Sequence, residues 1–190
     1  MNEFKKISQN KFNQLILSVA AMLFLISFEA QAGIYIEPYL GYNGGTLSTT
    51  VSSVAISDAL SGTMFGARVG YSIPTLWVGL DYSMASGLQS YAASQASLGS
   101  SADISRTGIT AGFTLIPMFD FMAGYVMSSK IKMGSTELSG KGVKLGLGWT
   151  MLPLISLVFE YQTLSYDNVS VFTDSTETVL SASVSLPLDL

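Results

Sequence analysis

The sequence predicts an all-β fold, namely an eight-stranded, antiparallel, up-and-down β-barrel that crosses a membrane and follows a cleavable signal peptide. Three observations predict it. An apolar N-terminal segment ends in a cleavage pattern, proline-centred turns alternate with longer polar stretches, and apolar side chains alternate with polar ones between them.

The N-terminal segment has the organisation of a secretory signal peptide. Three lysines lie within the first 11 residues, residues 15–28 are apolar, and Ala30-Gln31-Ala32 supplies the small-x-small cleavage pattern. The alternative is an uncleaved membrane anchor, but this apolar stretch is shorter than the roughly 20 residues that a spanning helix needs. We therefore expect a signal peptide at 1–32 and one barrel domain at 33–190.

Turns and polar stretches divide the rest of the chain into eight segments. Proline cannot donate to a sheet ladder, so Pro74, Pro117 and Pro153 each indicate a tight connection between strands. Polar stretches rich in Ser, Thr, Gly or Asn lie at 44–61, 86–103, 129–139 and 166–176. The expected strands lie near 34–43, 62–72, 76–85, 104–115, 119–128, 140–151, 154–165 and 177–189. Short turns at one end and longer external loops at the other are typical of a membrane barrel.

Every second residue of these segments is apolar, which places the apolar side chains on one face of each strand. In strand order this face contains Ile34, Ile36, Leu40 and Tyr42; Phe65, Ala67, Val69 and Tyr71; Leu76, Val78, Leu80, Tyr82 and Met84; Ile109, Ala111, Phe113 and Leu115; Phe121, Ala123, Tyr125 and Met127; Val143, Leu145, Leu147 and Trp149; Ile155, Leu157, Phe159 and Tyr161; and Leu180, Ala182, Val184 and Leu186. No charge shares it. A charge facing lipid costs about 2–4 kcal/mol near the midplane, so we expect this face to meet lipid, with aromatic residues at both of its edges.

The opposite face carries the charges. Its charged members are Glu37, Arg68, Asp81, Arg106, Asp120, Lys144 and Glu160. It also carries glycines, which leave room for long side chains inside a narrow barrel. A soluble barrel would instead have its apolar face inside. A helical membrane bundle is excluded because the most apolar window, 145–159, is short and contains Pro153.

The pattern resembles the small outer-membrane barrels that include the OmpA transmembrane domain, OmpX and Ail-type proteins. The resemblance lies in the signal peptide, the alternation and inward-Gly/outward-aromatic pairs such as Gly41-Tyr42 and Gly148-Trp149. It implies a monomer in a bacterial outer membrane, in contact with membrane lipid, lipopolysaccharide and the outer-membrane assembly machinery. The alternation continues to the C-terminus, where Leu190 replaces the terminal aromatic residue usual in the family.

Five of the inward charges lie at similar depths, namely Glu37, Arg68, Asp81, Lys144 and Glu160. We expect them to form a salt-bridged network, because buried charges are tolerated only when paired. The favoured interpretation is that this network closes the barrel, and that the external loops at 44–61 and 86–103 carry any contact with a surface partner. The alternative function is a narrow channel for small solutes, lined by the same charges.

Composition argues against other classes of function. The chain has no Cys and no His, which removes thiolate chemistry and the residue that most often serves as general base or metal ligand, and we expect no enzyme activity, cofactor or metal. A carboxylate pair among Asp81, Asp120 and Glu160 is the remaining catalytic candidate, indistinguishable by sequence from ion-pair partners. The formal net charge of −4 argues against nucleic-acid binding. Acidic residues in or beside the loops, such as Asp58 and Glu137, are expected to be solvated.

Overall fold

The computed structural model describes residues 32–51, 54–88, 91–92, 102–116, 118–133, 136–152, 154–167 and 172–190. They form the strands β1 (Gly33–Val51), β2 (Val54–Ile73), β3 (Leu76–Leu88), β4 (Tyr91–Ala92), β5 (Ala102–Ile116), β6 (Phe119–Met133), β7 (Thr136–Leu152), β8 (Ile155–Tyr166), β9 (Phe172–Ser185) and β10 (Leu188–Asp189). Within these ranges no helix is long and apolar enough to cross a membrane. Apart from Ala32, the expected signal peptide lies outside the described residues.

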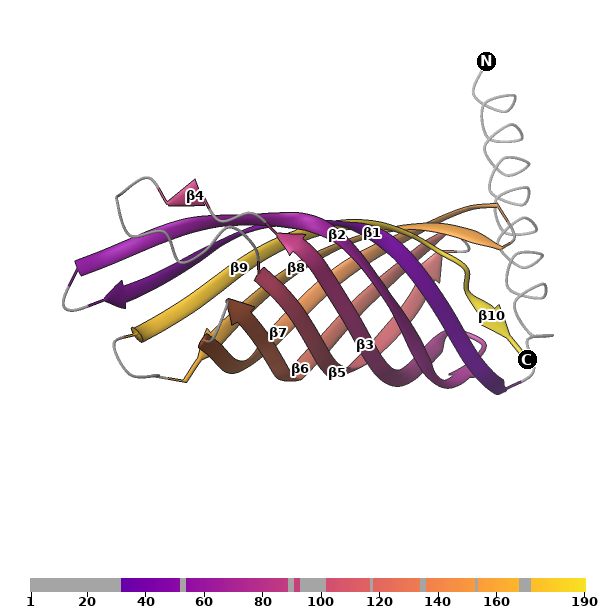
Figure 1. The fold of residues 1–190 in the computed structure, drawn as a ribbon. Coiled ribbons are helices and arrows are strands. Elements are labelled where there is room, and N and C mark those ends of the chain that lie inside the picture. The colour runs from indigo at the N-terminus through magenta and orange to yellow at the C-terminus, as the bar shows by residue number, and fades with distance from the viewer. Residues whose placement is uncertain are drawn as a thin grey trace, which may run out of the picture.

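The eight long strands, all but β4 and β10, close into one antiparallel barrel. Each pairs with the next long strand along the chain, and β1 closes the barrel by pairing with both β2 and β9. A path around the barrel can be traced by stepping from each residue to its paired residue on the next strand. A path that starts at Ile36 of β1 returns to β1 at Thr46, ten residues further along the chain. This stagger tilts the strands against the barrel axis, as Figure 1 shows. The predicted eight-stranded barrel is confirmed.

The two ends of the barrel differ. We call the end that holds the C-terminus and the Pro74 turn the inner end, and the opposite end the outer end. At the inner end β10 pairs with Tyr35 and Ile36 of β1, and the Leu186 amide donates to the Pro38 carbonyl at 3.0 Å. Pro38 and Pro187, which have no amide hydrogen, thus lie at the seam where β1 exchanges β10 for β9.

The strands extend further at the outer end than the sequence predicts. The expected loop 44–61 belongs mainly to β1 and β2, which are paired residue by residue as far as Val51 and Val54. The expected loop 129–139 likewise belongs to β6 and β7, which pair as far as Met133 and Thr136. Both loop predictions are wrong, because Ser, Thr and Gly were read as loop residues where they form a polar barrel wall. Of 86–103 and 166–176, residues 89–90, 93–101 and 168–171 lie outside the described residues.

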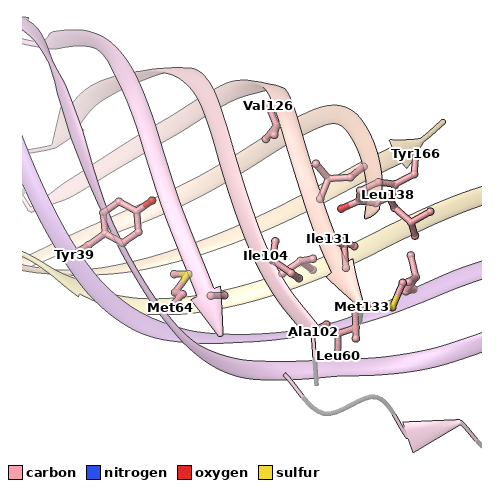
Figure 2. Close-up of a cluster of buried hydrophobic side chains, with 14 residues drawn as sticks. Tyr39, Leu60, Met64, Ala102, Ile104, Val126, Ile131, Met133, Leu138 and Tyr166 are labelled. Atoms are coloured by element: carbon pink, nitrogen blue, oxygen red, sulfur yellow. The ribbon is translucent and has the colours of Figure 1, made fainter. Parts of the chain in front are cut away.

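The wall reverses its polarity along the barrel axis. In the inner part, large apolar side chains face outward, among them Leu40, Leu80 and Leu145, which are 60–65% exposed. Towards the outer end the outward positions become Ser, Thr and Lys, while apolar side chains turn inward. Those inward side chains form one buried cluster, shown in Figure 2: Tyr39, Leu47, Leu60, Met64, Ala85, Ala102, Ile104, Val126, Ile131, Met133, Leu138, Leu164, Tyr166 and Val179. The outer part is therefore built like a soluble barrel, with an apolar core and a polar surface.

A β-bulge in β6 makes this reversal possible on that strand. The pairing with β7 skips between Val126 and Ser129, so the alternation of inward and outward positions shifts by one residue. Val126 is inward before the bulge, and Ile131 and Met133 are inward after it. Without the shift, Lys130 and Lys132 would point into the core.

Candidate functional site

A network of charges crosses the lumen in the inner part of the barrel, and Arg68 lies at its centre. Glu37, Arg68 and Asp81 are directly opposite one another on β1, β2 and β3. The Arg68 guanidinium lies 2.6 Å from Glu37 Oε2, 3.2 Å from Asp81 Oδ2 and 3.1 Å from Glu160 Oε1. The contact with Glu160 is a close ion pair without hydrogen-bond geometry. One fully buried cation thus holds three carboxylates from three strands.

Lys144 of β7 supplies the second cation of this network. Its Nζ atom pairs with Asp81, and it lies 3.1 Å from Glu160 Oε1. Two cations therefore face three carboxylates, and all five side chains are at most 5% exposed. Sequence reasoning expected these five residues to meet, and the structure brings them together.

Tyrosine hydroxyls donate further hydrogen bonds to two of these carboxylates. Tyr35 donates to Glu37 Oε2 at 2.7 Å, and Tyr39 donates to Asp81 Oδ1 at 2.7 Å. The Tyr39 ring also lies 4.6 Å from the Arg68 guanidinium carbon, a cation–π contact. Gly66 makes room for this ring, since a Cβ atom there would collide with it. Such added hydrogen bonds are what a buried ion pair needs to be stable.

Arg106 and Asp120, the other two predicted inward charges, lie apart from this network. Arg106 pairs with Glu177 of β9 at 2.7 Å, and Tyr166 donates to the same carboxylate, so this group lies among the outer apolar side chains. Asp120 lies at the inner end, where it accepts a hydrogen bond from Trp77 Nε1 at 2.9 Å. The predicted inward charges therefore occupy three levels of the lumen.

The inner end opens into a cavity of about 480 Å³, lined among others by Tyr35, Trp77, Asp120 and Asp189. The Tyr35 and Trp77 rings stack with their centroids 4.6 Å apart. Glu37 also lines this cavity, so the cavity ends at the charge network. In the described part of the chain, no group of three acidic residues is placed to hold a metal ion.

Comparison with known proteins agrees with this architecture. No protein-family model matches the chain, and no curated protein matches its sequence. Among solved structures, Neisserial surface protein A (NspA) is similar with a TM-score of 0.51 and 18% identity, over 83% of this chain and 99% of that one. The fold is that of a small outer-membrane β-barrel. Ail of Yersinia pestis aligns at 12% identity and a TM-score of 0.47, over 82% of this chain and 99% of that one.

Sequence reasoning missed several residues inside this small outer-membrane barrel fold. Three of them are Glu177, Tyr35 and Trp77. Each alternates along its strand with the outward apolar residues, and this alternation could have identified it as inward. Asp58 was expected to be solvated, and this is wrong, because its side chain points inward from β2 and is 1% exposed. Its segment was interpreted as a loop, and the alternation of inward and outward side chains applies only to strands.

Proposed function

We propose that the chain is a bacterial outer-membrane protein whose barrel is closed, and which acts as a structural or surface-interaction protein through its outer end. The observation that carries this proposal is the apolar cluster in the outer part of the lumen, beyond the ion-pair network. Together the two layers leave Arg68 fully buried and Ile131, Leu138 and Leu164 at 0% exposure. A pore would need polar, solvated side chains along this path.

The outward face supports a location in lipid. Tyr71, Phe121 and Trp149 lie towards the inner end of this face, and Tyr42, Phe65, Tyr82 and Tyr161 lie towards its outer edge, all exposed. Aromatic residues at both edges of an apolar band are typical of barrels that cross a membrane. The expected signal peptide at 1–32 would direct export.

The outer end offers a candidate contact surface in the β1–β2 hairpin. β2 pairs with β1 from Val54 to Ser72, whereas it pairs with β3 only from Thr63 to Ile73. With the outer part of β9, the hairpin therefore projects beyond the rest of the barrel, as Figure 1 shows. Its outward side chains are small and mostly polar, including Thr46, Ser48 and Ser57. We assign surface contacts to this hairpin, within the predicted segment 44–61.

Single-channel recording tests whether the barrel is closed. We expect folded protein in a planar bilayer to give no steady conductance, because ion pairs and apolar side chains occupy successive levels of its lumen. The same sample is run on a detergent gel with and without heating. A difference in migration between the unheated and the heated protein verifies that the added protein is folded. Steady conductance that changes on Arg68→Ala substitution would instead support the channel function.

Substitutions on the outward face of the hairpin test the contact surface without touching its core. The measurement is the adhesion of cells that display the protein on their surface, either to matrix or to host cells. We expect Ser48→Arg combined with Ala59→Arg to reduce this adhesion to the level of cells that lack the protein. Both side chains are exposed, so the barrel should fold normally. The matched control is Thr163→Arg with Ser165→Arg on β8, also exposed. Equal adhesion by both variants and the parent would contradict this assignment.

A further inference from the structure

The cavity at the inner end has an acidic wall. Glu37, Asp120 and Asp189 line it, and none of the described residues around it is Lys or Arg. In the adjoining charge network two cations face three carboxylates, which leaves one negative charge without a partner of opposite sign. Two cations and five carboxylates therefore give the network and the cavity together a net charge of −3.

Glu37 reaches this cavity with one oxygen that accepts no hydrogen bond from the described residues. The Tyr35 hydroxyl at 2.7 Å and the Arg68 guanidinium at 2.6 Å both donate to Oε2. The side chain is only 4% exposed, and a carboxylate has room for further donors at its second oxygen. Since Glu37 lines the cavity, Oε1 is the atom available to a cationic donor placed there.

A stacked aromatic pair connects Glu37 with Asp120. Tyr35 donates to Glu37, and Trp77 Nε1 donates to Asp120 Oδ2 at 2.9 Å. The two rings stack with their centroids 4.6 Å apart, and both belong with Met122 to a buried apolar cluster on the cavity wall. The cavity therefore offers hydrocarbon contact next to two carboxylates whose orientation is fixed by hydrogen bonds.

Asp189 of β10 adds a carboxylate nearer the inner end, where Figure 1 shows the C-terminal strand. It is paired with Tyr35, two residues before Glu37 on β1, so it lies roughly 7 Å from Glu37 along the strand. Ser72 of β2 donates to Asp189 Oδ1 at 2.6 Å and orients the side chain. Tyr35 spans the two levels, since its backbone lies opposite Asp189 and its hydroxyl reaches Glu37.

This arrangement favours an organic cation over a metal ion. In the described part of the chain, no three acidic residues converge as a metal site requires. The cavity volume of about 480 Å³ is within the range of small-molecule sites. An alkylammonium ion supplies a positive charge for a carboxylate and methylene groups for an apolar wall. Carboxylates at two levels require a positive charge at each end of the alkyl chain.

We propose that the inner-end cavity binds a linear aliphatic diamine. One ammonium group contacts Glu37 Oε1 and Asp120, the alkyl chain packs along Tyr35 and Trp77, and the second ammonium group contacts Asp189. The cavity ends at the charge network, so the ligand enters from the inner end. This site lies at the opposite end of the barrel from the β1–β2 hairpin and does not depend on the contacts assigned to that hairpin.

Calorimetry of the folded protein tests the proposal. Protein expressed from the complete chain is purified from membranes in detergent and titrated with cadaverine, a five-carbon diamine, or with butylamine as the monoamine. The buffer contains about 0.15 M NaCl, which screens non-specific attraction to the acidic chain. We expect the Kd of cadaverine to be about tenfold lower than that of butylamine, because only the diamine reaches both levels of carboxylates.

Two isosteric substitutions locate the two ammonium groups. Asp189→Asn keeps an acceptor for Ser72, and we expect it to weaken cadaverine binding by about tenfold while leaving butylamine binding unchanged. Asp120→Asn keeps an acceptor for Trp77 and should weaken the binding of both amines by about fivefold. The matched control is Glu137→Gln, an exposed carboxylate at the outer end, which should change neither Kd.

Tryptophan fluorescence reports where the diamine binds. The chain has two Trp residues, and Trp149→Phe leaves Trp77 as the only one. Trp149 faces outward, so this substitution leaves the cavity wall intact. We expect cadaverine to change the emission of Trp77 with the midpoint that calorimetry gives.

The outcomes decide between this site and a general attraction of cations. Equal Kd values for cadaverine and butylamine would overturn the proposal, and so would cadaverine binding that both Asp→Asn variants leave unchanged. Displacement of cadaverine by an equal concentration of Mg²⁺ would also overturn it. Migration on a detergent gel with and without heating verifies that each variant is folded. If Asp120→Asn does not fold, the comparison of the two amines on Asp189→Asn decides alone.

Discussion

Replacing Arg68 with alanine is expected to lower the free energy of unfolding by about 3–5 kcal/mol, the usual cost of removing one partner from a buried ion pair. The substitution leaves Glu37, Asp81 and Glu160 in the lumen with Lys144 as the only cation of the network. Lys144 contacts only two of these carboxylates, so Glu37 loses its ionic partner. Urea unfolding of the barrel in lipid vesicles measures the change.

Two further variants show whether this loss comes from the geometry of the network. Arg68→Lys keeps the charge but cannot place three nitrogens against three carboxylates, so we expect an intermediate loss. Lys130→Ala breaks an exposed ion pair and should change the unfolding midpoint far less than Arg68→Ala does. An unfolding midpoint for Arg68→Ala equal to that of the parent would show that the network does not stabilise the barrel.

The second large effect is expected in the outer apolar cluster. Leu164→Ala should lower the free energy of unfolding by about 2–5 kcal/mol, because it removes buried methyl groups and leaves a cavity inside the barrel. Leu164 has 0% exposure and lies beyond the apolar band, where neither lipid nor water can replace the lost contacts. The same urea titration applies.

Leu145→Ala is the matched control for this prediction. Leu145 is 61% exposed on the outward face, where lipid chains can fill the space left by the substitution. The cavity term should therefore be absent and the loss smaller. Equal losses for Leu164→Ala and Leu145→Ala would mean that the outer cluster does not act as a packed core.

These two predictions concern two different ways of filling one lumen. In the inner part, where the wall faces lipid, the ion-pair network crosses the lumen, and a small apolar cluster of Tyr35, Trp77, Met122 and Val158 lies between it and the inner-end cavity. In the outer part, where the wall is polar outside, it is filled by apolar side chains around the smaller Arg106–Glu177 pair. The reversal follows from the solvent of each part, because apolar residues face lipid where it is present and the interior where water replaces it.

Much of the barrel could be predicted from the sequence, because a strand has a period of two wherever it lies. The alternation of Val78, Leu80 and Tyr82 with Gly79 and Asp81 assigns each residue to a face without knowledge of its neighbours. The same argument gave the strand number and the inward direction of Arg68, Lys144 and Glu160. It failed at 44–61, where the alternation continues but the apolar side chains, such as Leu47 and Leu60, turn inward.

The sequence by itself therefore determined the barrel class, the outward apolar surface and the inward direction of seven charges, but not that of Asp58 and Glu177. Only the tertiary structure decided which charges meet, since Arg68 contacts Glu160 across the lumen and Arg106 contacts Glu177, although β5 and β9 are not paired strands. The β6 bulge that turns Lys130 outward was also decided at this level. The physical reason is that local alternation fixes the face of a residue, whereas strand stagger, bulges and closure fix its height and its partners.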